Sequence, residues 1–146
     1  RANLRLMVMT GGQYELCRRE QTTSRQSKSG LELDVKDHYN GTLRPAASLS
    51  GGESFVASLA LALGLSDEIR ATAGGVELNA LFVDEGFGTL SEEILNHAVQ
   101  TLQQLAEGDR IVGIISHVAE LKERIEKQIV VKKLKSGGST VQIRVG

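Results

Sequence analysis

Two adjacent carboxylates, Asp84 and Glu85, come directly after the short apolar run Leu81–Val83 and directly before Gly86. An apolar run of this length next to a turn signal predicts a buried strand of a parallel sheet. Open α/β sheets bind ligands at the carboxyl ends of their strands. Two acids in a partly dry place cost free energy unless a cation or a reaction uses them. The pair therefore predicts a site for Mg²⁺ and an attacking water.

A second candidate site is the segment Ser50-Gly51-Gly52-Glu53. Ser50 and Glu53 have the spacing of an S-x-x-E capping box, which is a common way to begin a helix. The two glycines are a poor choice for a helix, because each costs about 1 kcal/mol relative to alanine inside one. Glycine at a helix N-terminus lets backbone N–H groups approach an anion closely. The segment therefore predicts a phosphate contact in addition to the cap.

A third candidate is His117, which follows Ser116 at the end of the apolar run Ile111–Ile115. A single histidine after a buried strand is more often a hydrogen-bonded structural residue than a functional one. Its value here comes from the order of features along the chain. A glycine-rich helix start is followed by an acid-tipped strand, a helix and then a strand that ends in histidine.

In this order the three segments resemble the nucleotide-binding domain of the ABC-type ATPases. Leu49 to Glu53 resembles the ABC signature, Leu81 to Glu85 the Walker B strand, and Ser116-His117 the switch histidine. The run from Asp84 to Leu90 is similar to the Walker B and D-loop of the SbcC family, the ATPase subunits of bacterial SbcC–SbcD nucleases. The family's usual D-loop aspartate is replaced here by Ser91, so no catalytic role is expected of Ser91.

The resemblance implies ATP and Mg²⁺ as cofactors and a role for each site residue. Asp84 is expected to orient Mg²⁺ and Glu85 to act as general base toward the attacking water. His117 is expected to hydrogen-bond the γ-phosphate or that water. The γ-phosphate of a second copy of the head is expected to bind the signature, which comprises Ser50, Gly51, Gly52 and Glu53.

No G-x-x-x-x-G-K-[ST] loop occurs anywhere in the sequence. The site is therefore expected to be half of an ATPase, active only when joined to an N-terminal half that carries the P-loop. The resemblance further implies an ATP-dependent homodimer of heads, a metallo-nuclease subunit of the SbcD type, and action on double-stranded DNA ends and hairpins during repair. ATP binding is expected to hold the two heads together, and hydrolysis to release them.

Three alternatives to this interpretation fit the sequence less well. A DNA clamp ATPase of the SMC or RecN kind, without a nuclease partner, is disfavoured by the insertion Gly86-Phe87-Gly88 after the acids. A transporter ATPase is disfavoured because Glu53 ends the signature and no proline follows Glu85. A non-catalytic α/β interaction domain is disfavoured because three motifs occur in the right order.

The bulk composition excludes several classes of protein. The net charge of −1 gives no global signal for nucleic acid, so any DNA contact must be local. No apolar run approaches the roughly 20 residues of a membrane span, and a single cysteine fits a reducing compartment. We therefore expect a cytoplasmic, nucleoid-associated protein without membrane contact. A chain that begins with Arg1 is expected to be a fragment.

The elements that must position these residues follow from the hydrophobic pattern. The sequence predicts an α/β fold, the C-terminal lobe of an ABC-type P-loop ATPase head, with parallel core strands, flanking helices and an antiparallel hairpin at each end. A single lobe is expected over residues 1–146. Within it we expect the end of a coiled-coil re-entry helix at 1–12, strands and a loop at 13–48, and the signature, Walker B and switch-histidine core at 49–146.

Individual elements can be placed more closely. Expected strands cover 14–19, 31–35, 76–83, 110–116, 128–135 and 140–145, and expected helices cover 51–70, 91–107 and 119–125. The helix at 51–70 is apolar nearly all round, so burial on most faces is expected. Thr89 or Ser91 is expected to cap the helix at 91–107, and residues 38–49 are expected to form a loop. Basic residues cluster in the first hairpin, where a solvated surface is favoured over a DNA contact; they are Arg18, Arg19, Arg25 and Lys28.

Overall fold

The computed structural model describes residues 1–19, 32–72, 79–107 and 110–146. These residues form two compact units, Arg1–Ile115 and Ser116–Gly146. The described strands form one parallel pair and two antiparallel sheets, so the predicted mixed α/β class is confirmed. No helix in the described ranges is long and apolar enough to span a membrane.

The first unit begins with helix α1 (Ala2–Met9), which ends before two glycines in the left-handed region, Gly11 and Gly12. A helix was predicted within residues 1–12, and its presence is confirmed. The buried residues are Leu6 and Met9, whereas Leu4 is exposed. The face that carries Leu6 and Met9 is therefore the one that packs against the core.

A three-stranded antiparallel sheet follows, formed by β1 (Tyr14–Arg18), β2 (Leu33–Asp37) and β3 (Thr42–Pro45). The prediction of a loop over residues 38–49 was wrong, because a tight turn with Gly41 at φ 71° returns the chain along the free edge of β2. The second strand was predicted at 31–35, whereas β2 begins and ends two residues later. The connection between the first two predicted strands lies outside the described residues.

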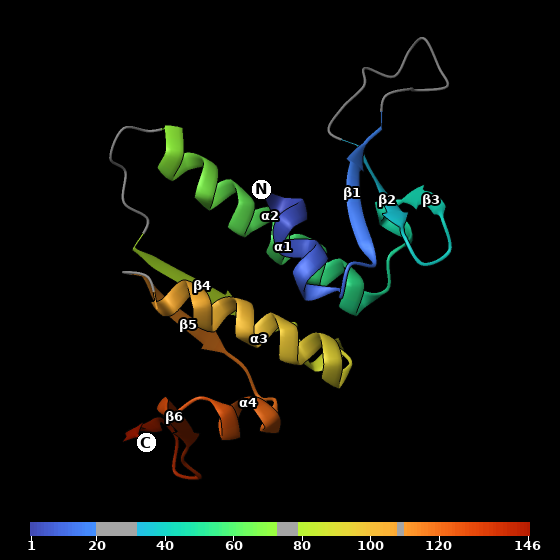
Figure 1. Ribbon diagram of the computed structural model, residues 1–146. Coiled ribbons are helices and arrows are strands. Elements are labelled where there is room, and N and C mark those ends of the chain that lie inside the picture. Colours follow the sequence, from blue (N-terminus) through green and yellow to red (C-terminus); the bar gives the residue numbers. More distant parts are fainter. Residues whose placement is uncertain (20–31, 73–78, 108–109) are drawn as a thin grey trace, which may run out of the picture. The chain divides into compact units, whose positions relative to one another are not determined.

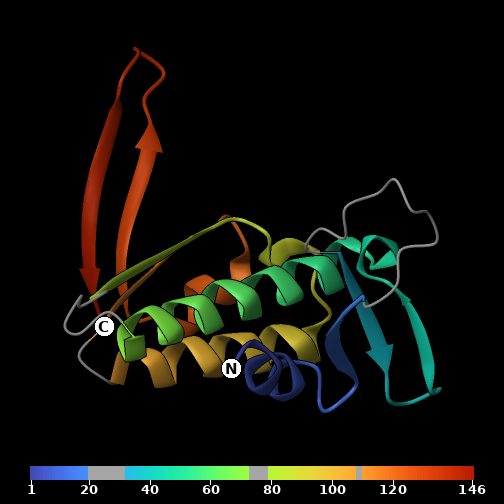
Figure 2. The same ribbon diagram turned by 90° about the horizontal axis from the view of Figure 1, so that it is seen from above.

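Helices α2 (Gly51–Thr72) and α3 (Glu92–Glu107) pack with α1 into a helical layer, which Figures 1 and 2 show from two directions. A Cβ atom on Gly64 would lie 2.6 Å from the backbone nitrogen of Ala2, so glycine permits the close crossing of α1 and α2. The predicted burial of α2 on most faces is wrong for one side of the helix. Exposed apolar side chains recur there at helical spacing: Leu61, Leu65 and Ile69.

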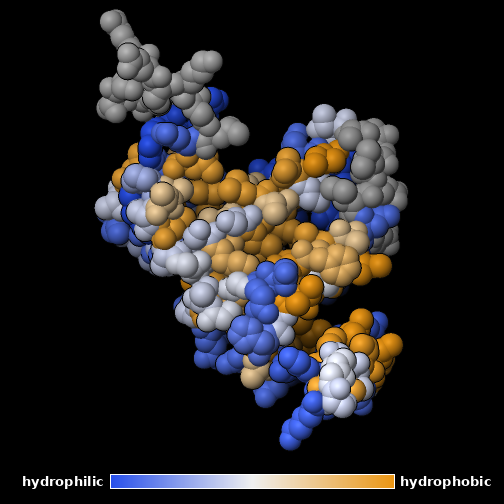
Figure 3. Space-filling model, turned by 180° about the vertical axis from the view of Figure 1, so that it is seen from behind, coloured by the Kyte–Doolittle hydropathy of each residue, from blue (hydrophilic) through white to orange (hydrophobic). Residues whose placement is uncertain are grey.

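The core strands β4 (Ala80–Asp84) and β5 (Ile111–Ile115) are parallel, as predicted, with Asp84 opposite Ile115. Residues 76–78 of the predicted strand lie outside the described residues. Val83 is buried, but Phe82 is 68% exposed, so β4 has an open face instead of the full burial that was expected. Ile111 and Ile115 are also exposed, and Figure 3 shows extensive hydrophobic surface on the face seen from behind.

The second unit contains helix α4 (Ala119–Arg124) and the antiparallel hairpin of β6 (Lys127–Lys133) and β7 (Ser139–Val145). The hairpin turn has Gly137 at φ 93° and Gly138 at φ 80°, a conformation that favours glycine. The predicted closing hairpin is thus confirmed, and its turn chemistry explains the Ser-Gly-Gly-Ser sequence.

Candidate functional site

The acid pair lies where the sequence predicted, at the carboxyl end of β4. Asp84 is the last residue of the strand and Glu85 is the first residue after it. Glu85 has φ 58°, and its N–H donates a 2.8 Å hydrogen bond to the carbonyl of Ile115 on β5. A non-glycine residue with this backbone conformation is uncommon, and such strain is typical of functional positions.

Both acids are exposed in this chain, so the expected dry environment is not provided by the described residues alone. One exposed carboxylate at a strand end fits Mg²⁺, because this ion commonly takes one or two protein carboxylates and fills its remaining positions with water and phosphate oxygens. Within the described ranges no group of three His, Cys, Asp or Glu residues could hold a metal by itself. Asp84 is therefore suited to be a single protein ligand of an ion whose other ligands come from outside the described residues.

The segment after the acids is packed against the signature helix. A short 3-10 helix, η2 (Phe87–Thr89), begins after Gly86, which has φ 92°. The Phe87 side chain is 1% exposed and meets the Phe55 ring of α2 edge-on, with centroids 5.0 Å apart. A Cβ atom on Gly86 would lie 2.2 Å from that ring. The Gly-Phe insertion therefore attaches the acid-bearing turn to α2.

The two signature glycines have different surroundings. A Cβ atom on Gly52 would lie 2.6 Å from the backbone oxygen of Thr89, so this glycine is required by the close approach of η2. A Cβ atom on Gly51 would meet nothing closer than a methyl carbon of Thr89 at 4.0 Å. Packing therefore explains why position 52, which is buried, must be glycine. It does not explain the glycine at position 51, which is exposed.

The capping box is present at the start of α2. The Ser50 N–H donates to Glu53 Oε2 at 2.7 Å, and the Glu53 N–H donates to Ser50 Oγ at 3.3 Å. This reciprocal pair satisfies two N–H groups at the helix start. The structural explanation of Ser50 and Glu53 is thus correct as far as it goes. It does not engage the N–H of Gly51 or of Gly52, which lie too early in the helix to have an intrahelical acceptor.

Two residues that sequence reasoning missed hold Glu53 in place. The Tyr14 hydroxyl on β1 donates to Glu53 Oε1, and Arg44 Nη2 on β3 lies 3.5 Å from Glu53 Oε2. The Arg44 guanidinium also lies over the Tyr14 ring, 5.8 Å from its centroid. No spacing in the sequence connects these three residues, because they come from two strands and a helix. Together they tie the antiparallel sheet to the signature.

The pKa values at this contact are shifted in opposite directions. Burial and the hydrogen bond to Glu53 raise the pKa of Tyr14 to about 12. Burial alone would raise the pKa of Glu53, but hydrogen bonds from Tyr14 and Ser50 outweigh it and hold that pKa below its usual value. The pair therefore persists as a neutral phenol and a carboxylate across the neutral pH range.

Ser91, which replaces the usual D-loop aspartate, has a structural partner. Its Oγ accepts a 3.4 Å hydrogen bond from the Ile94 N–H, and its carbonyl accepts one of 2.8 Å from the Leu95 N–H. Ser91 therefore caps α3, as Thr89 or Ser91 was expected to do. Thr89 instead donates its hydroxyl to the Gly86 carbonyl at 2.9 Å and stabilises the turn after the acids.

His117 follows Ile115 by two residues and belongs to the second unit. The hydroxyl oxygen of Ser116 accepts a 3.2 Å hydrogen bond from the Val118 N–H, which sets the turn out of the strand. The structure thus brings the signature and the acid pair together within the first unit. The position of His117 relative to Glu85 stays a prediction.

The basic cluster of the first hairpin is described in part. Arg18 is exposed, whereas Arg19 pairs with Asp34 and Glu32 across the strands. The hydrogen bond from Arg19 lowers the pKa of Asp34. Arg25 and Lys28 lie outside the described residues. Since Arg19 already has acidic partners, the described part of this cluster gives no support to a DNA contact.

The sequence matches the family described as "SbcC/RAD50-like, Walker B motif" over residues 15–104. It is 47% identical to the SbcC subunit of the nuclease SbcCD from Treponema pallidum, over 97% of this chain and 14% of that protein. It is 51% identical to the protein of the same name from Vibrio cholerae, over 94% of this chain and 14% of that protein. The chain thus spans about a seventh of these relatives' length.

Solved structures show the same fold at low sequence identity. The "SmcHead bound to the C-winged helix domain of ScpA" has a TM-score of 0.74 and 14% identity, over 99% of this chain and 41% of that chain. An Smc head domain from Pyrococcus furiosus has a TM-score of 0.70 and 17% identity, over 99% of this chain and 33% of that chain. The fold is similar to that of part of these Smc head domains, and the sequence matches show that this chain belongs to the SbcC/RAD50-like family.

Proposed function

We propose that this chain is the signature- and Walker B-bearing half of an ATPase head, and that a P-loop half completes it. The observation that carries the proposal is the pair of close contacts between the signature helix and the acid-bearing turn. Gly52 lies against Thr89, and Phe55 lies against Phe87. These contacts couple the start of α2 to the turn that presents Asp84 and Glu85, as an ATPase driven by dimerisation requires.

In this proposal Asp84 would help to hold Mg²⁺, and Glu85 accepts a proton from the attacking water. When bound, the ion would supply positive charge to balance the charge that develops on the phosphate oxygens. The hydrogen bond from the Glu85 N–H to Ile115 holds the backbone of the base against β5. His117, which leaves the same strand, is proposed to hydrogen-bond the γ-phosphate or the attacking water.

The start of α2 is proposed to bind the γ-phosphate of a second head. The N–H groups of Gly51 and Gly52 point out of the helix N-terminus, where the macrodipole favours an anion. Ser50 adds a hydroxyl next to them, and Gly51 has room for close approach. Glu53 is proposed to hold the start of α2 in place without touching the phosphate, since its carboxylate is already bound by Tyr14, Arg44 and Ser50.

A P-loop half explains the apolar surface that this chain leaves open. Leu61, Leu65 and Ile69 on α2 are exposed, as are Phe82 on β4 and Ile115 on β5. Large exposed apolar areas mark interaction surfaces. The relatives, of which this chain covers about a seventh, have room for such a half. Its docking is also proposed to remove water from the exposed acids.

The relatives' name, which makes them subunits of the nuclease SbcCD, extends the proposal to a DNA repair complex. The head is proposed to work with a metallo-nuclease subunit on double-stranded DNA ends and hairpins, in the cytoplasm at the nucleoid. In that complex ATP closes two heads and hydrolysis reopens them. If no nuclease co-purifies with the full-length protein, a clamp ATPase of the SMC or RecN kind replaces this part of the proposal.

The proposal is tested with Ser50→Arg in the full-length protein, with Ser58→Arg as the matched control. Ser58 is an exposed serine two turns further along α2. If Ser50 faces the γ-phosphate of the other head, the Ser50→Arg protein is expected to bind ATP normally but to remain monomeric. The Ser58→Arg protein is expected to bind ATP and to dimerise. Dimerisation is measured by size-exclusion chromatography with ATP.

A mixing experiment then tests contact between two heads. A Ser50→Arg head still supplies a P-loop, and a head with an inactivated P-loop still supplies a signature, so the mixture can build one composite site. ATP hydrolysis in the mixture, with neither parent active, supports the proposal. If Ser50→Arg heads dimerise as the wild type does, Ser50 is only a helix cap and the proposed signature role is wrong.

A further inference from the structure

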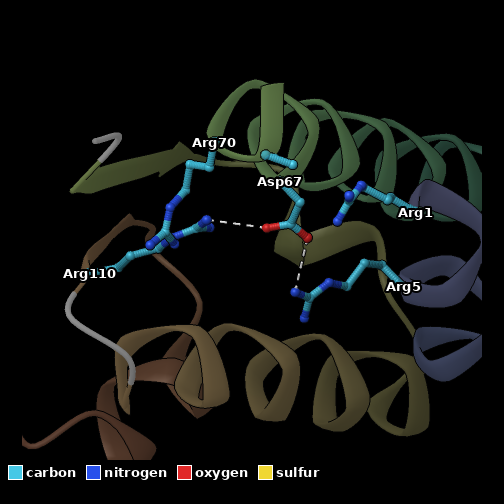
Figure 4. A pocket seen from close by; sticks show the side chains of 6 residues that line it. Arg1, Arg5, Asp67, Arg70 and Arg110 are labelled. Carbon is cyan, nitrogen blue, oxygen red and sulfur yellow. Dashed lines mark hydrogen bonds and ion pairs between the residues drawn. The ribbon is translucent and has the colours of Figure 1, made fainter. Parts of the chain in front are cut away.

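A shallow pocket of about 450 Å³ lies at the end of the helical layer away from the acid pair (Figure 4). Its walls come from α1, from the C-terminal end of α2 and from the start of β5. The signature lies at the opposite end of α2, roughly 30 Å away at 1.5 Å per residue. The residues that line the pocket are Arg1, Arg5, Asp67, Arg70, Ala71 and Arg110. The proposed ATP chemistry uses none of them.

The pocket holds more positive than negative charge. Asp67 is shared by two arginines, with Arg5 Nη2 at 3.1 Å and Arg110 Nη2 at 3.2 Å. Arg1 pairs with Glu68 at 2.7 Å. Among the described residues, these four arginines face two carboxylates, Asp67 in the pocket and Glu68 beside it, which leaves an excess of two positive charges. The C-terminal dipole of α2 offsets only about half a charge.

Two of the arginines have unused hydrogen-bonding capacity. The Arg110 side chain is only 7% exposed, and its Nε is buried without an acceptor among the described residues. Arg70 makes no ion pair within the described ranges, although it lines the same pocket. A guanidinium has five N–H donors, so one bond to Asp67 leaves most of those of Arg110 unused. Buried donors are normally satisfied, and an orphan calls for an acceptor.

We propose that this arginine pocket binds a phosphate-class oxyanion. The excess of positive charge favours an anion, and phosphate oxygens are acceptors for the guanidinium forks of Arg70 and Arg110. Asp67 positions Arg5 and Arg110 and keeps their charges from repelling each other. The ligand is either a free phosphate compound or a backbone phosphate of nucleic acid. It is distinct from the ATP phosphates, which the proposed function places at the other end of α2.

The test measures the melting temperature of the full-length protein during titration with inorganic phosphate, without ATP or Mg²⁺, at constant ionic strength. A ligand that binds only the folded state raises this temperature. Arg70→Gln is the main variant, because Arg70 is exposed and its loss leaves the fold intact. Arg18→Gln is the matched control: it removes the same charge from an exposed position on β1.

We expect phosphate to stabilise the wild type and Arg18→Gln equally, and Arg70→Gln to bind phosphate roughly tenfold more weakly or worse. Arg110→Lys, which keeps the charge and loses the fork, is expected to weaken binding as well. Phosphate bound at a P-loop would be unaffected by either variant. If phosphate stabilises the wild type, Arg18→Gln, Arg70→Gln and Arg110→Lys equally, the proposal is overturned. This result is independent of whether the protein is the proposed ATPase.

Competition identifies the source of the oxyanion. If a short DNA duplex displaces phosphate from the wild type, and Arg70→Gln binds the duplex more weakly than Arg18→Gln does, the ligand is a backbone phosphate. If phosphate stabilises the wild type but the duplex does not compete, the ligand is a free phosphate compound. Both outcomes support the oxyanion pocket, and only the absence of Arg70-dependent phosphate binding refutes it.

Discussion

The two adjacent signature glycines are expected to respond in opposite ways to alanine. In Gly52→Ala the new methyl group is placed 2.6 Å from the carbonyl oxygen of Thr89, well inside van der Waals contact. In Gly51→Ala the nearest atom is 4.0 Å away and nothing must move. Neither glycine has a positive φ, so backbone strain does not enter the comparison. The pair isolates a steric effect at one position.

The magnitude follows from what must shift. Relief of the Gly52→Ala contact needs η2 to move away from α2, and η2 carries the buried Phe87, which packs on Phe55. Overpacking of this kind costs about 1–3 kcal/mol, more than the gain of up to about 1 kcal/mol when alanine replaces glycine in a helix. We therefore expect Gly52→Ala to lower the free energy of unfolding by roughly 1–2 kcal/mol. Gly51→Ala is expected to change it by less than about 0.5 kcal/mol.

The assay is urea denaturation of both variants and the wild type, followed by circular dichroism, with ATP-driven dimerisation measured in parallel. The expected pattern is an unstable Gly52→Ala protein and a stable Gly51→Ala protein that dimerises poorly, since its methyl group stands where the phosphate is proposed to bind. If Gly52→Ala is as stable as Gly51→Ala, then η2 does not lie against the signature helix and the coupling argument fails.

Three further outcomes are expected. The Tyr14 pKa is raised to about 12, so the stability that the neutral phenol contributes is present below pH 10 and is lost as the pH rises toward 12. In unfolding curves measured at alkaline pH, the Tyr14→Phe protein should not show this loss of stability. The lowered pKa of Glu53 contributes stability at neutral pH that is lost as the pH falls below about 4.5, and Glu53→Gln should show a smaller loss in acid; an unchanged loss contradicts this. Glu85→Gln should slow ATP hydrolysis about 100-fold or more and leave ATP-dependent dimerisation intact, whereas a normal rate in a turnover assay excludes Glu85 as the base.

Much of the candidate site was predictable from local sequence. The pairing of β4 and β5 followed from two apolar runs separated by an amphipathic helix, and chain order alone placed Asp84 and Glu85 at a strand end. The capping box followed from the spacing of Ser50 and Glu53. These features depend on residues a few positions apart, where periodicity and turn chemistry act directly.

Contacts between distant segments were decided only by the tertiary structure. The need for glycine at position 52 comes from the backbone of Thr89, and the partners that hold Glu53 come from β1 and β3. The third strand escaped prediction because an edge strand is stabilised by the hydrogen bonds of its neighbour rather than by its own hydrophobic pattern. The exposure of Asp84 and Glu85 could not be predicted either. Burial at a strand end depends on which other segments cover it, and the hydrophobic pattern of one strand does not reveal those segments.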